Sequence, residues 1–305
     1  MARTRRAMNK ILLLGCTGEV GSRLCLKLLE DGFIVFGVRG SKPCKIVHIN
    51  HSCIKLDLLN FSSSLDLKNF KPNIMVHTAW ITKPNIFWDS PLNYDWARES
   101  KRLIQEFEEN GGEYLVVTGS CAEYSWVNQE AMSETFTENP QSAYGKSKVE
   151  LLNWIRSRNL PFLWVRTFFQ FGLTEPNGRL IPSLIDSILL EENYVIQNSN
   201  VIRDFVYIKD VVEVLYILIN RESLGIINIG SGIGSNIKST SENIAKLMNR
   251  QDLLCYAGTD NKQKSLVVSN SHKLNELLPK FVWTNFESAI LETIEIRKRM
   301  LMRKI

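Results

Sequence analysis

The sequence predicts an α/β protein with a doubly wound parallel sheet at its centre. In the first half of the chain, short apolar runs of strand length alternate with segments of helical periodicity, which is typical of this class. The first of these runs also leads into a glycine-rich turn. The 305 residues include 44% hydrophobic and 23% charged side chains, a composition that can bury the core of one large or two ordinary domains.

The first strand is expected at Lys10–Leu14 and the first helix at Val20–Leu29. Between them, Gly15, Gly18 and Gly21 form a Gly-x-x-Gly-x-x-Gly pattern, which in this strand–turn–helix context indicates a dinucleotide site. The glycines would permit, in order, a tight turn, a close approach of the backbone to a pyrophosphate, and close packing of helix on strand. The pyrophosphate would rest on free amides at the helix N-terminus. An ordinary glycine-rich loop is the alternative.

The second strand is expected at Phe33–Val38, and the residue after it is Arg39. Sites for NAD usually carry an acid here to bind the ribose hydroxyls, whereas an arginine can accept the 2′-phosphate of NADP. Ser41 and Lys42 follow closely. The sequence therefore favours NADP as the cofactor, with NAD as the alternative cofactor and a solvated basic turn as the alternative without a function.

Further strands are expected at Ile54–Asp57, Ile74–His77 and Tyr114–Thr118, and a long helix at Pro91–Asn110. His77 ends a buried strand, and we interpret it as a hydrogen-bonded structural residue rather than a catalytic base. Functional residues of such a sheet gather at the C-terminal ends of its strands. The predicted cofactor-binding residues at these strand ends and in the glycine loop are Gly15, Thr17, Gly18, Glu19, Val20, Gly21, Arg39, Asp57, Leu58, Thr78 and Ala79.

Tyr144 and Lys148 lie four residues apart in the helix expected at Tyr144–Arg158, so both side chains would occupy one helix face. A cation beside a tyrosine favours the phenolate and lowers the phenol pKa from about 10, which suits proton transfer. Ser120 follows the strand at Tyr114–Thr118 and can face the same crevice. Taken alone, the Tyr–Lys spacing is equally compatible with an exposed helix pair that has no chemical role.

The second half of the chain mixes short strands with helices and offers few titratable residues that look catalytic, so we expect it to cover the substrate. Its elements are expected at Leu163–Thr167, Ile181–Leu190, Asp204–Ile208, Val211–Asn220, Ile226–Ile229, Thr240–Met248 and Phe286–Met300. The dinucleotide-binding domain is predicted at 9–167, with 203–230 returning to it. The substrate-binding cap is predicted at 168–202 and 231–305.

Charge and composition argue against several other classes of protein. The net charge of +5 is mild and owes much to Arg3, Arg5 and Arg6, so no nucleic-acid binding is expected. The longest apolar run, Val211–Ile219, contains Glu213 and is too short for a membrane span. The six cysteines and four histidines show no metal-ligand spacing, which predicts reduced thiols, a cytoplasmic location and no metal site.

The glycine loop, Ser120 and the Tyr144/Lys148 pair together resemble the extended short-chain dehydrogenase/reductases. Within these, the chain is similar to the NAD-dependent epimerase/dehydratase group, which acts on nucleotide-activated sugars. The resemblance spans nearly the whole chain and implies a Rossmann-like domain followed by a smaller C-terminal α/β substrate-binding cap. It implies that Tyr144 is the general acid/base and that Ser120 hydrogen-bonds the reacting oxygen. Lys148 would bind the nicotinamide ribose and lower the tyrosine pKa, supported by Asn93.

The same resemblance implies a nucleotide-sugar substrate. The segment that begins at Arg203 resembles the family's Arg-Asp-Phe/Tyr segment, whose arginine binds the substrate pyrophosphate through a planar fork. Arg179 would offer a second cation, and Asn228–Gly232 matches the stretch that closes the nucleotide side. The family often forms homodimers, for which the helices at Pro91–Asn110 and Tyr144–Arg158 are the candidates.

Two departures from the family pattern bear on the reaction. Sugar-nucleotide dehydratases carry an acidic pair directly after the catalytic hydroxyl residue, where this chain has Cys121 and Ala122, and Glu123 comes one position too late. Phe169 stands where many members have a substrate-side asparagine. Because the acidic pair is missing, dehydration is not expected; because of Phe169, the family's sugar contacts are not carried over to this chain.

The expected reaction is the reduction of a nucleotide-linked 4-keto sugar, in particular a 4-keto-6-deoxy sugar. NADPH would supply the hydride while Tyr144 protonates the carbonyl oxygen and Ser120 polarises it. A 4-epimerase that uses tightly held NAD is the alternative enzyme. A non-catalytic NADP-binding sensor is the alternative from another class.

Overall fold

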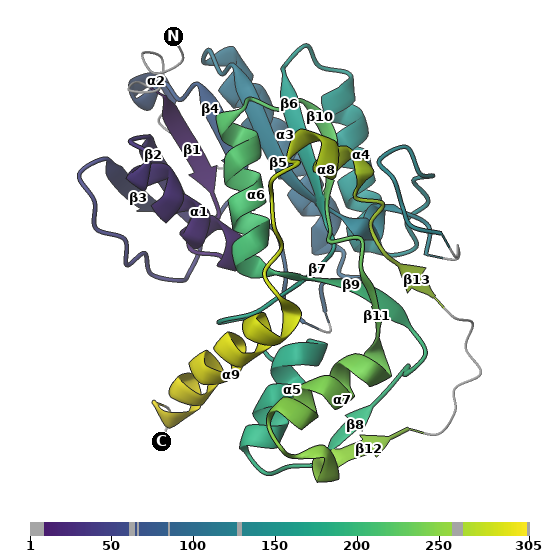
Figure 1. Ribbon diagram of the computed structural model, residues 1–305. Coiled ribbons are helices and arrows are strands. Elements are labelled where there is room, and N and C mark those ends of the chain that lie inside the picture. Colours follow the sequence, from purple (N-terminus) through teal and green to yellow (C-terminus); the bar gives the residue numbers. More distant parts are fainter. Residues whose placement is uncertain are drawn as a thin grey trace.

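The computed structural model describes residues 9–60, 65, 67–84, 86–126, 130–257 and 265–303. Arg3, Arg5 and Arg6, which carry much of the predicted excess charge, lie outside this part of the chain. The described residues form a large sheet with helices on both faces. A smaller group of helices and short strands lies below it in Figure 1, beyond the ends of its strands.

The predicted parallel sheet is confirmed. Its strands follow the order β10-β6-β5-β4-β1-β2-β3, and every neighbouring pair is parallel. The strands are β1 (Lys10–Leu14), β2 (Ile34–Arg39), β3 (His51–Lys55), β4 (Ile74–His77), β5 (Tyr114–Ser120), β6 (Phe162–Thr167) and β10 (Gly225–Ile229). The chain reverses its direction of travel across the sheet between β1 and β4, which is where such sheets bind ligands.

The two faces of the sheet explain why its strands read as continuous apolar runs. In β1, Ile11 and Leu13 pack on one face, whereas Leu12 and Leu14 pack on the other. Helices α1 (Glu19–Glu30) and α6 (Ile208–Asn220) cover the first face. Helices α3 (Leu92–Glu109) and α4 (Ala143–Arg156), with the short α2 (Leu67–Phe70), cover the second.

The smaller part has its own apolar core. It contains α5 (Leu180–Leu189), α7 (Ile237–Leu247), η3 (Gln251–Leu253), α9 (Phe286–Met302) and the strand pair β8 (Tyr194–Ile196) with β12 (Leu254–Tyr256). A small sheet joins the two parts and is made of β7 (Phe169–Phe171), β9 (Ile202–Tyr207), β11 (Gly234–Asn236) and β13 (Leu266–Val267). This sheet carries the substrate-binding candidate Arg203, on β9, and Phe169, on β7, whereas the candidate Arg179 directly precedes α5.

Two predicted boundaries differ from the structure. The third strand lies at His51–Lys55 rather than Ile54–Asp57, because β2 pairs with β3 from Val35 and His51 onward, so Asp57 follows the strand. After residue 231 the chain also returns to the large sheet: α8 (His272–Leu277) packs against β10, and Leu274 joins the core beneath it.

None of the helices in the described part of the chain combines the length and the apolar character needed to cross a bilayer.

Candidate active site

The glycine loop between β1 and α1 has the geometry of an anion cradle. Gly15 has a φ of +87°, and a Cβ there would lie 2.8 Å from the backbone nitrogen of Ala79. A Cβ on Gly21 would lie 2.2 Å from the carbonyl oxygen of Gly15, so helix and loop could not approach so closely with any other residue. Gly18 caps α1 without a side-chain hydrogen bond, which leaves the first amides of the helix free.

The neighbouring residues predicted to bind the cofactor surround this loop. Thr78 donates from its backbone nitrogen (3.0 Å) and its hydroxyl (2.8 Å) to the carbonyl oxygen of Leu14, which places Thr78 and Ala79 against Gly15. Glu19 pairs with Arg23 at 3.0 Å. Thr17 and Val20 are partly buried beside it.

The next two strands end in the remaining cofactor candidates. The Arg39 guanidinium donates to the carbonyl oxygens of Gly40 (3.2 Å) and Lys42 (3.3 Å), in its own turn. Asp57 is exposed and Leu58 is buried, just beyond the end of β3. Among the described residues, none of the recorded ion pairs involves Arg39, so its charge is available to an anion.

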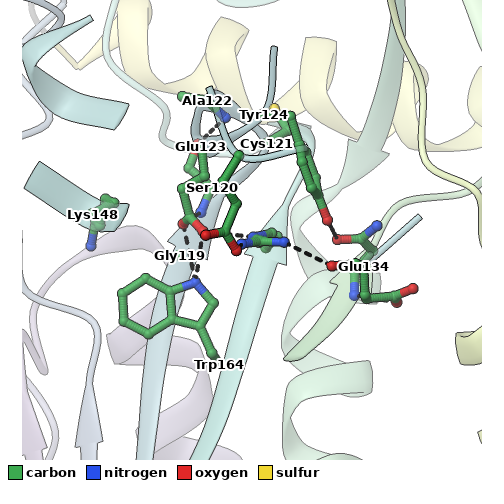
Figure 2. A network of polar contacts seen from close by, with 12 residues as sticks. Gly119, Ser120, Cys121, Ala122, Glu123, Tyr124, Glu134, Lys148 and Trp164 are labelled. Carbon is green, nitrogen blue, oxygen red and sulfur yellow. Dashed lines mark hydrogen bonds and ion pairs between the residues drawn. The ribbon is translucent and has the colours of Figure 1, made fainter. Parts of the chain in front are cut away.

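Ser120 ends β5 in a tight turn, η2 (Cys121–Glu123), that a buried carboxylate holds in place (Figure 2). The Ser120 hydroxyl accepts a hydrogen bond from the amide of Ala122 at 3.1 Å, and Glu123 accepts one from the amide of Ser120 at 2.7 Å. Glu123 is fully buried and also accepts from the Trp164 indole (3.0 Å) and from Arg166 (2.6 Å). In the sequence, Glu123 is recognisable only as an acid one position away from the dehydratase pattern, because its partners Trp164 and Arg166 lie more than forty residues later.

The partner of that carboxylate is a buried arginine on β6. Arg166 contacts Glu138 as well as Glu123, and it lies 4.4 Å from the ring centroid of Tyr124. Burial alone would lower the pKa of Arg166, but Glu123 and Tyr124 raise it above its ordinary value. The guanidinium therefore stays charged, and its role is structural.

Tyr144 and Lys148 lie on one face of α4, as their spacing predicts. The Tyr144 ring packs edge-on against Phe87, with 5.2 Å between ring centroids. Lys148 is buried; its ammonium donates to the carbonyl oxygen of Thr118 at 2.8 Å and lies 3.5 Å from the centroid of the Trp80 ring. The same ammonium is 5.9 Å from the centroid of the Tyr144 ring.

The predicted lowering of the tyrosine pKa is not found in this structure. Burial raises the pKa of Tyr144 above its ordinary value, and a hydrogen bond with Ser120 offsets only part of that effect. Burial also lowers the pKa of Lys148 to about 7, against the opposing charge of Glu123. Since the ammonium contacts Thr118 and Trp80 instead of the phenol oxygen, it does not outweigh the desolvation of the phenol.

Asn93 reaches the lysine only through an aromatic ring. Its side-chain oxygen accepts from the Trp80 indole at 2.9 Å, and its side-chain nitrogen donates to the carbonyl oxygens of Phe87 (2.6 Å) and Ser90 (2.9 Å). Asn93 thus fixes the ring on which the Lys148 ammonium rests.

His77 lies near this group and takes no part in it. Its Nε2 is 2.7 Å from the Ser100 hydroxyl, and burial lowers its pKa to about 3, so the ring is neutral. This is the hydrogen-bonded structural histidine that the sequence predicts.

A cavity of about 540 Å³ opens beside Tyr144. Phe87 and Trp88 belong to its wall, and both rings pack against Tyr144. The full lining is Pro84, Phe87, Trp88, Phe169, Gln170, Phe171, Glu175, Gly178, Arg179, Leu180, Ile181, Gln197, Asn198, Val201, Arg203, Phe205, Ile237 and Ser265. Arg179 pairs with Glu175 at 3.3 Å, and the pKa of that carboxyl is raised to about 7 by burial.

Arg203 enters the same cavity without a carboxylate partner among the described residues. Its guanidinium lies between two rings, 5.1 Å from the centroid of Trp126 and 5.2 Å from that of Phe169. Its recorded hydrogen bonds go to the carbonyl oxygen of Ile202 and to the carbonyl and hydroxyl oxygens of Ser265. Burial lowers the pKa of Arg203 to about 10. A cation that is desolvated in a cavity and lacks a counter-ion favours an anionic ligand.

The stretch Asn228–Gly232 is hydrogen-bonded to residues that follow Ser120 and Arg203. Asn228 is fully buried and accepts a hydrogen bond from the Tyr124 hydroxyl at 2.7 Å. Asp204 accepts from the backbone amides of Ser231 and Gly232, each at 3.0 Å. The residue after Arg203 thereby ties β9 to the end of β10.

Comparison with known proteins decides the family. The model of the NAD dependent epimerase/dehydratase family matches residues 11–230. The chain belongs to this family. The resemblance inferred from the motifs is thus confirmed, and so are the predictions that the protein is an enzyme and that it uses a nicotinamide dinucleotide.

Individual relatives of this family member are distant. A UDP-glucose 4-epimerase of Rhizobium meliloti (strain 1021) is 23% identical, over 88% of this chain and 91% of its own. A GDP-L-colitose synthase of Yersinia pseudotuberculosis is 25% identical, over 94% and 97%. Among solved structures, a UDP-N-acetylglucosamine 4-epimerase from Methanobrevibacter ruminantium M1 in complex with UDP-N-acetylmuramic acid superposes with a TM-score of 0.83 at 22% identity, covering 97% of this chain and 99% of that chain. This likeness establishes the fold.

Proposed function

We propose that this family member reduces a nucleotide-linked 4-keto sugar, in particular a 4-keto-6-deoxy sugar, with NADPH. The observation that carries the proposal is the meeting of Ser120, Tyr144 and Lys148 beside a cavity that two arginines line. The glycine loop fits a dinucleotide, since a Cβ on Gly15 or Gly21 would collide with its neighbours and the helix N-terminus is uncapped.

The side chains of the site suit proton donation. When bound, the reduced nicotinamide supplies the hydride to the carbonyl carbon. Tyr144 gives its phenolic proton to the carbonyl oxygen, and the Ser120 hydroxyl hydrogen-bonds the same oxygen. The Tyr144 phenol is protonated at neutral pH, since burial raises its pKa, so it has a proton to give; the same rise makes it a weaker acid than an exposed phenol.

The cavity supports an anionic, nucleotide-bearing substrate. Arg203 would bind the pyrophosphate through its planar guanidinium. Arg179 lies close enough to Tyr144 for its positive charge to act against the rise in the pKa of the phenol. Cys121 and Ala122 cannot act as acids in an elimination of water, and Glu123 is committed to Arg166. Arg39 supports NADP over NAD.

A 4-epimerase is the second candidate, and the UDP-sugar 4-epimerases among the relatives favour it. A panel of nucleotide 4-keto sugars, followed at the nicotinamide absorbance band, separates the two. Stoichiometric consumption of NADPH supports the reductase. Protein that retains NAD through purification and interconverts nucleotide sugars without added cofactor contradicts it.

Replacing the proposed proton donor tests the assignment directly. Tyr144→Phe is expected to lower kcat by roughly 10²–10⁴-fold, the usual contribution of a general acid. Tyr194→Phe, in β8 of the smaller part, is the matched control and is expected to keep full activity. Unchanged turnover by Tyr144→Phe would refute the assignment.

We also propose that the protein is a homodimer. Leu92 and Tyr94, at the start of α3, are 43% and 44% exposed, and they would become buried if two copies paired through α3 and α4. Size-exclusion chromatography with light scattering measures the mass of the protein in solution. A monomer at micromolar concentration would rule the homodimer out.

A further inference from the structure

Three cysteines that are far apart in the sequence meet beneath the glycine loop. Cys16 belongs to that loop, Cys44 lies in the connection between β2 and β3, and Cys53 lies on β3. Their three sulfur atoms all lie within 4.8 Å of one another, and those of Cys16 and Cys53 are 3.5 Å apart. All three are free thiols, because a disulfide needs about 2.05 Å between sulfurs.

A histidine side chain lies beside the three thiols, although its ring nitrogens are not all within 4.8 Å of the three sulfurs. His51 precedes Cys53 by two residues on β3, so both side chains point to the same face of the sheet. The Nδ1 atom of His51 is 3.3 Å from the carbonyl oxygen of Ile46, whereas its Nε2 atom is buried and has no hydrogen-bond partner. A proton on Nδ1 leaves a free lone pair on Nε2, which is the form that ligates a metal.

Gly37, on β2, has no side chain, and this leaves space for the Cys16 sulfur and the His51 ring. A Cβ on Gly37 would lie 2.7 Å from the sulfur of Cys16 and 3.2 Å from Nε2 of His51. Thiol and imidazole therefore lie over the same point of the sheet, and any larger residue at position 37 would push them apart.

We propose that Cys16, Cys44, Cys53 and His51 bind one zinc ion. Three thiolates and one imidazole form a usual tetrahedral zinc set. Zinc–sulfur bonds of about 2.3 Å put tetrahedral sulfurs roughly 3.8 Å apart, inside the range that these sulfurs already span. The hydrogen bond from His51 to Ile46 orients the ring as the outer contacts of zinc ligands do. Binding releases the thiol protons to solvent.

The ion would cross-link a poorly packed segment to the cofactor loop. The connection over residues 40–50 contains no helix or strand, and its Val47 and Ile49 are 97% and 94% exposed. Cys44 lies in this connection, whereas Cys16 is fully buried in the core that α1 covers. Coordination would hold both against β3.

The prediction of no metal site rested on the spacing of ligands along the chain. That criterion recognises pairs of ligands a few residues apart, and only His51 and Cys53 are so placed here. The other two ligands reach the group through the pairing of β1, β2 and β3.

Cobalt substitution tests the proposal on the full chain. The purified protein, kept reduced by a phosphine and stripped with a chelator, is titrated with Co²⁺ and then with Zn²⁺. One equivalent of cobalt is expected to produce a thiolate-to-metal charge-transfer band and tetrahedral ligand-field bands, which zinc abolishes. Zinc is also expected to raise the melting temperature of the stripped protein.

Variants identify the ligands. Cys44→Ser, in the exposed connection, and His51→Gln are each expected to weaken binding at least about tenfold and to alter the cobalt spectrum. Cys255→Ser, on β12 of the smaller part, is the matched control and should bind as wild type does. Circular dichroism without metal checks that each variant folds.

Either of two results would overturn the proposal. One is a reduced, folded wild-type protein that shows no thiolate–cobalt band at micromolar metal. The other is a Cys44→Ser spectrum and affinity identical to those of Cys255→Ser.

Discussion

Arg166 and Arg203 are both desolvated arginines on strands, and they differ in their partners. Arg166 contacts two carboxylates, those of Glu123 and Glu138. Within the described part of the chain, Arg203 contacts carbonyl and hydroxyl oxygens and two aromatic rings but no carboxylate. The pKa of Arg166 is raised by its carboxylate partner, whereas burial lowers the pKa of Arg203. A buried cation that already has its counter-ions holds the fold together, whereas one that lacks them is prepared for an anionic ligand.

The largest expected effect concerns the paired arginine. Glu123→Ala leaves Arg166 buried with one carboxylate fewer and removes the acceptor of the Ser120 amide, so the free energy of unfolding should fall by about 3–5 kcal/mol. Glu150→Ala, which removes the exposed partner of Lys101, should cost less than about 1 kcal/mol. Urea denaturation measures both. If the two variants lost the same free energy of unfolding, burial of the Glu123–Arg166 pair would make no difference to stability.

Lys148 is a third buried cation, and its effect depends on pH. Its pKa of about 7 in the folded chain lies below the value of about 10.4 for an unfolded lysine, so the unfolded state binds more protons between these values. Stability should therefore rise with pH over this window. Lys148→Met should remove that rise and stabilise the protein below pH 7 by about 2 kcal/mol, since the lost hydrogen bond to Thr118 offsets part of the gain. A variant with the wild-type pH profile would contradict the lowered pKa.

Arg203→Met should weaken binding of the nucleotide sugar without lowering the stability of the fold. Loss of a charge-assisted fork is worth about 1.5–3 kcal/mol, so KM for the nucleotide sugar should rise roughly 10–150-fold while urea stability stays the same or improves. Arg203→Lys keeps the charge and loses the fork, and should fall in between. If Arg203→Met destabilised the protein as Glu123→Ala does, the distinction between the two arginines would fail.

The smallest effect belongs to an exposed arginine. Arg39→Ala should raise KM for NADPH about tenfold, a change of about 1.4 kcal/mol, and leave KM for NADH unchanged. Lys280→Ala, at an exposed position after α8, serves as the control. Parallel increases for both cofactors would show that Arg39 does not distinguish the 2′-phosphate.

Much of the fold and part of the site were predictable because their determinants are local. Glycine is required at position 15 by its positive φ and at position 21 by close packing against the Gly15 carbonyl oxygen. Both requirements arise within a dozen residues of chain. The spacing of Tyr144 and Lys148 determines their common helix face in the same way. Continuous apolar strands separated by helical segments leave few topologies other than a parallel sheet.

The tertiary structure decided what each of these residues touches. Glu123 obtains its partners from β6, more than forty residues later, and Lys148 meets a tryptophan from the end of β4. The thiol cluster likewise needs a loop, a connection and a strand that become neighbours only through strand pairing. Burial and charge compensation depend on such distant neighbours. The sequence alone determined the fold and the position of the cofactor loop, whereas the protonation of Tyr144, the role of Glu123 and the meeting of Cys16, Cys44 and Cys53 depend on contacts that no local spacing encodes.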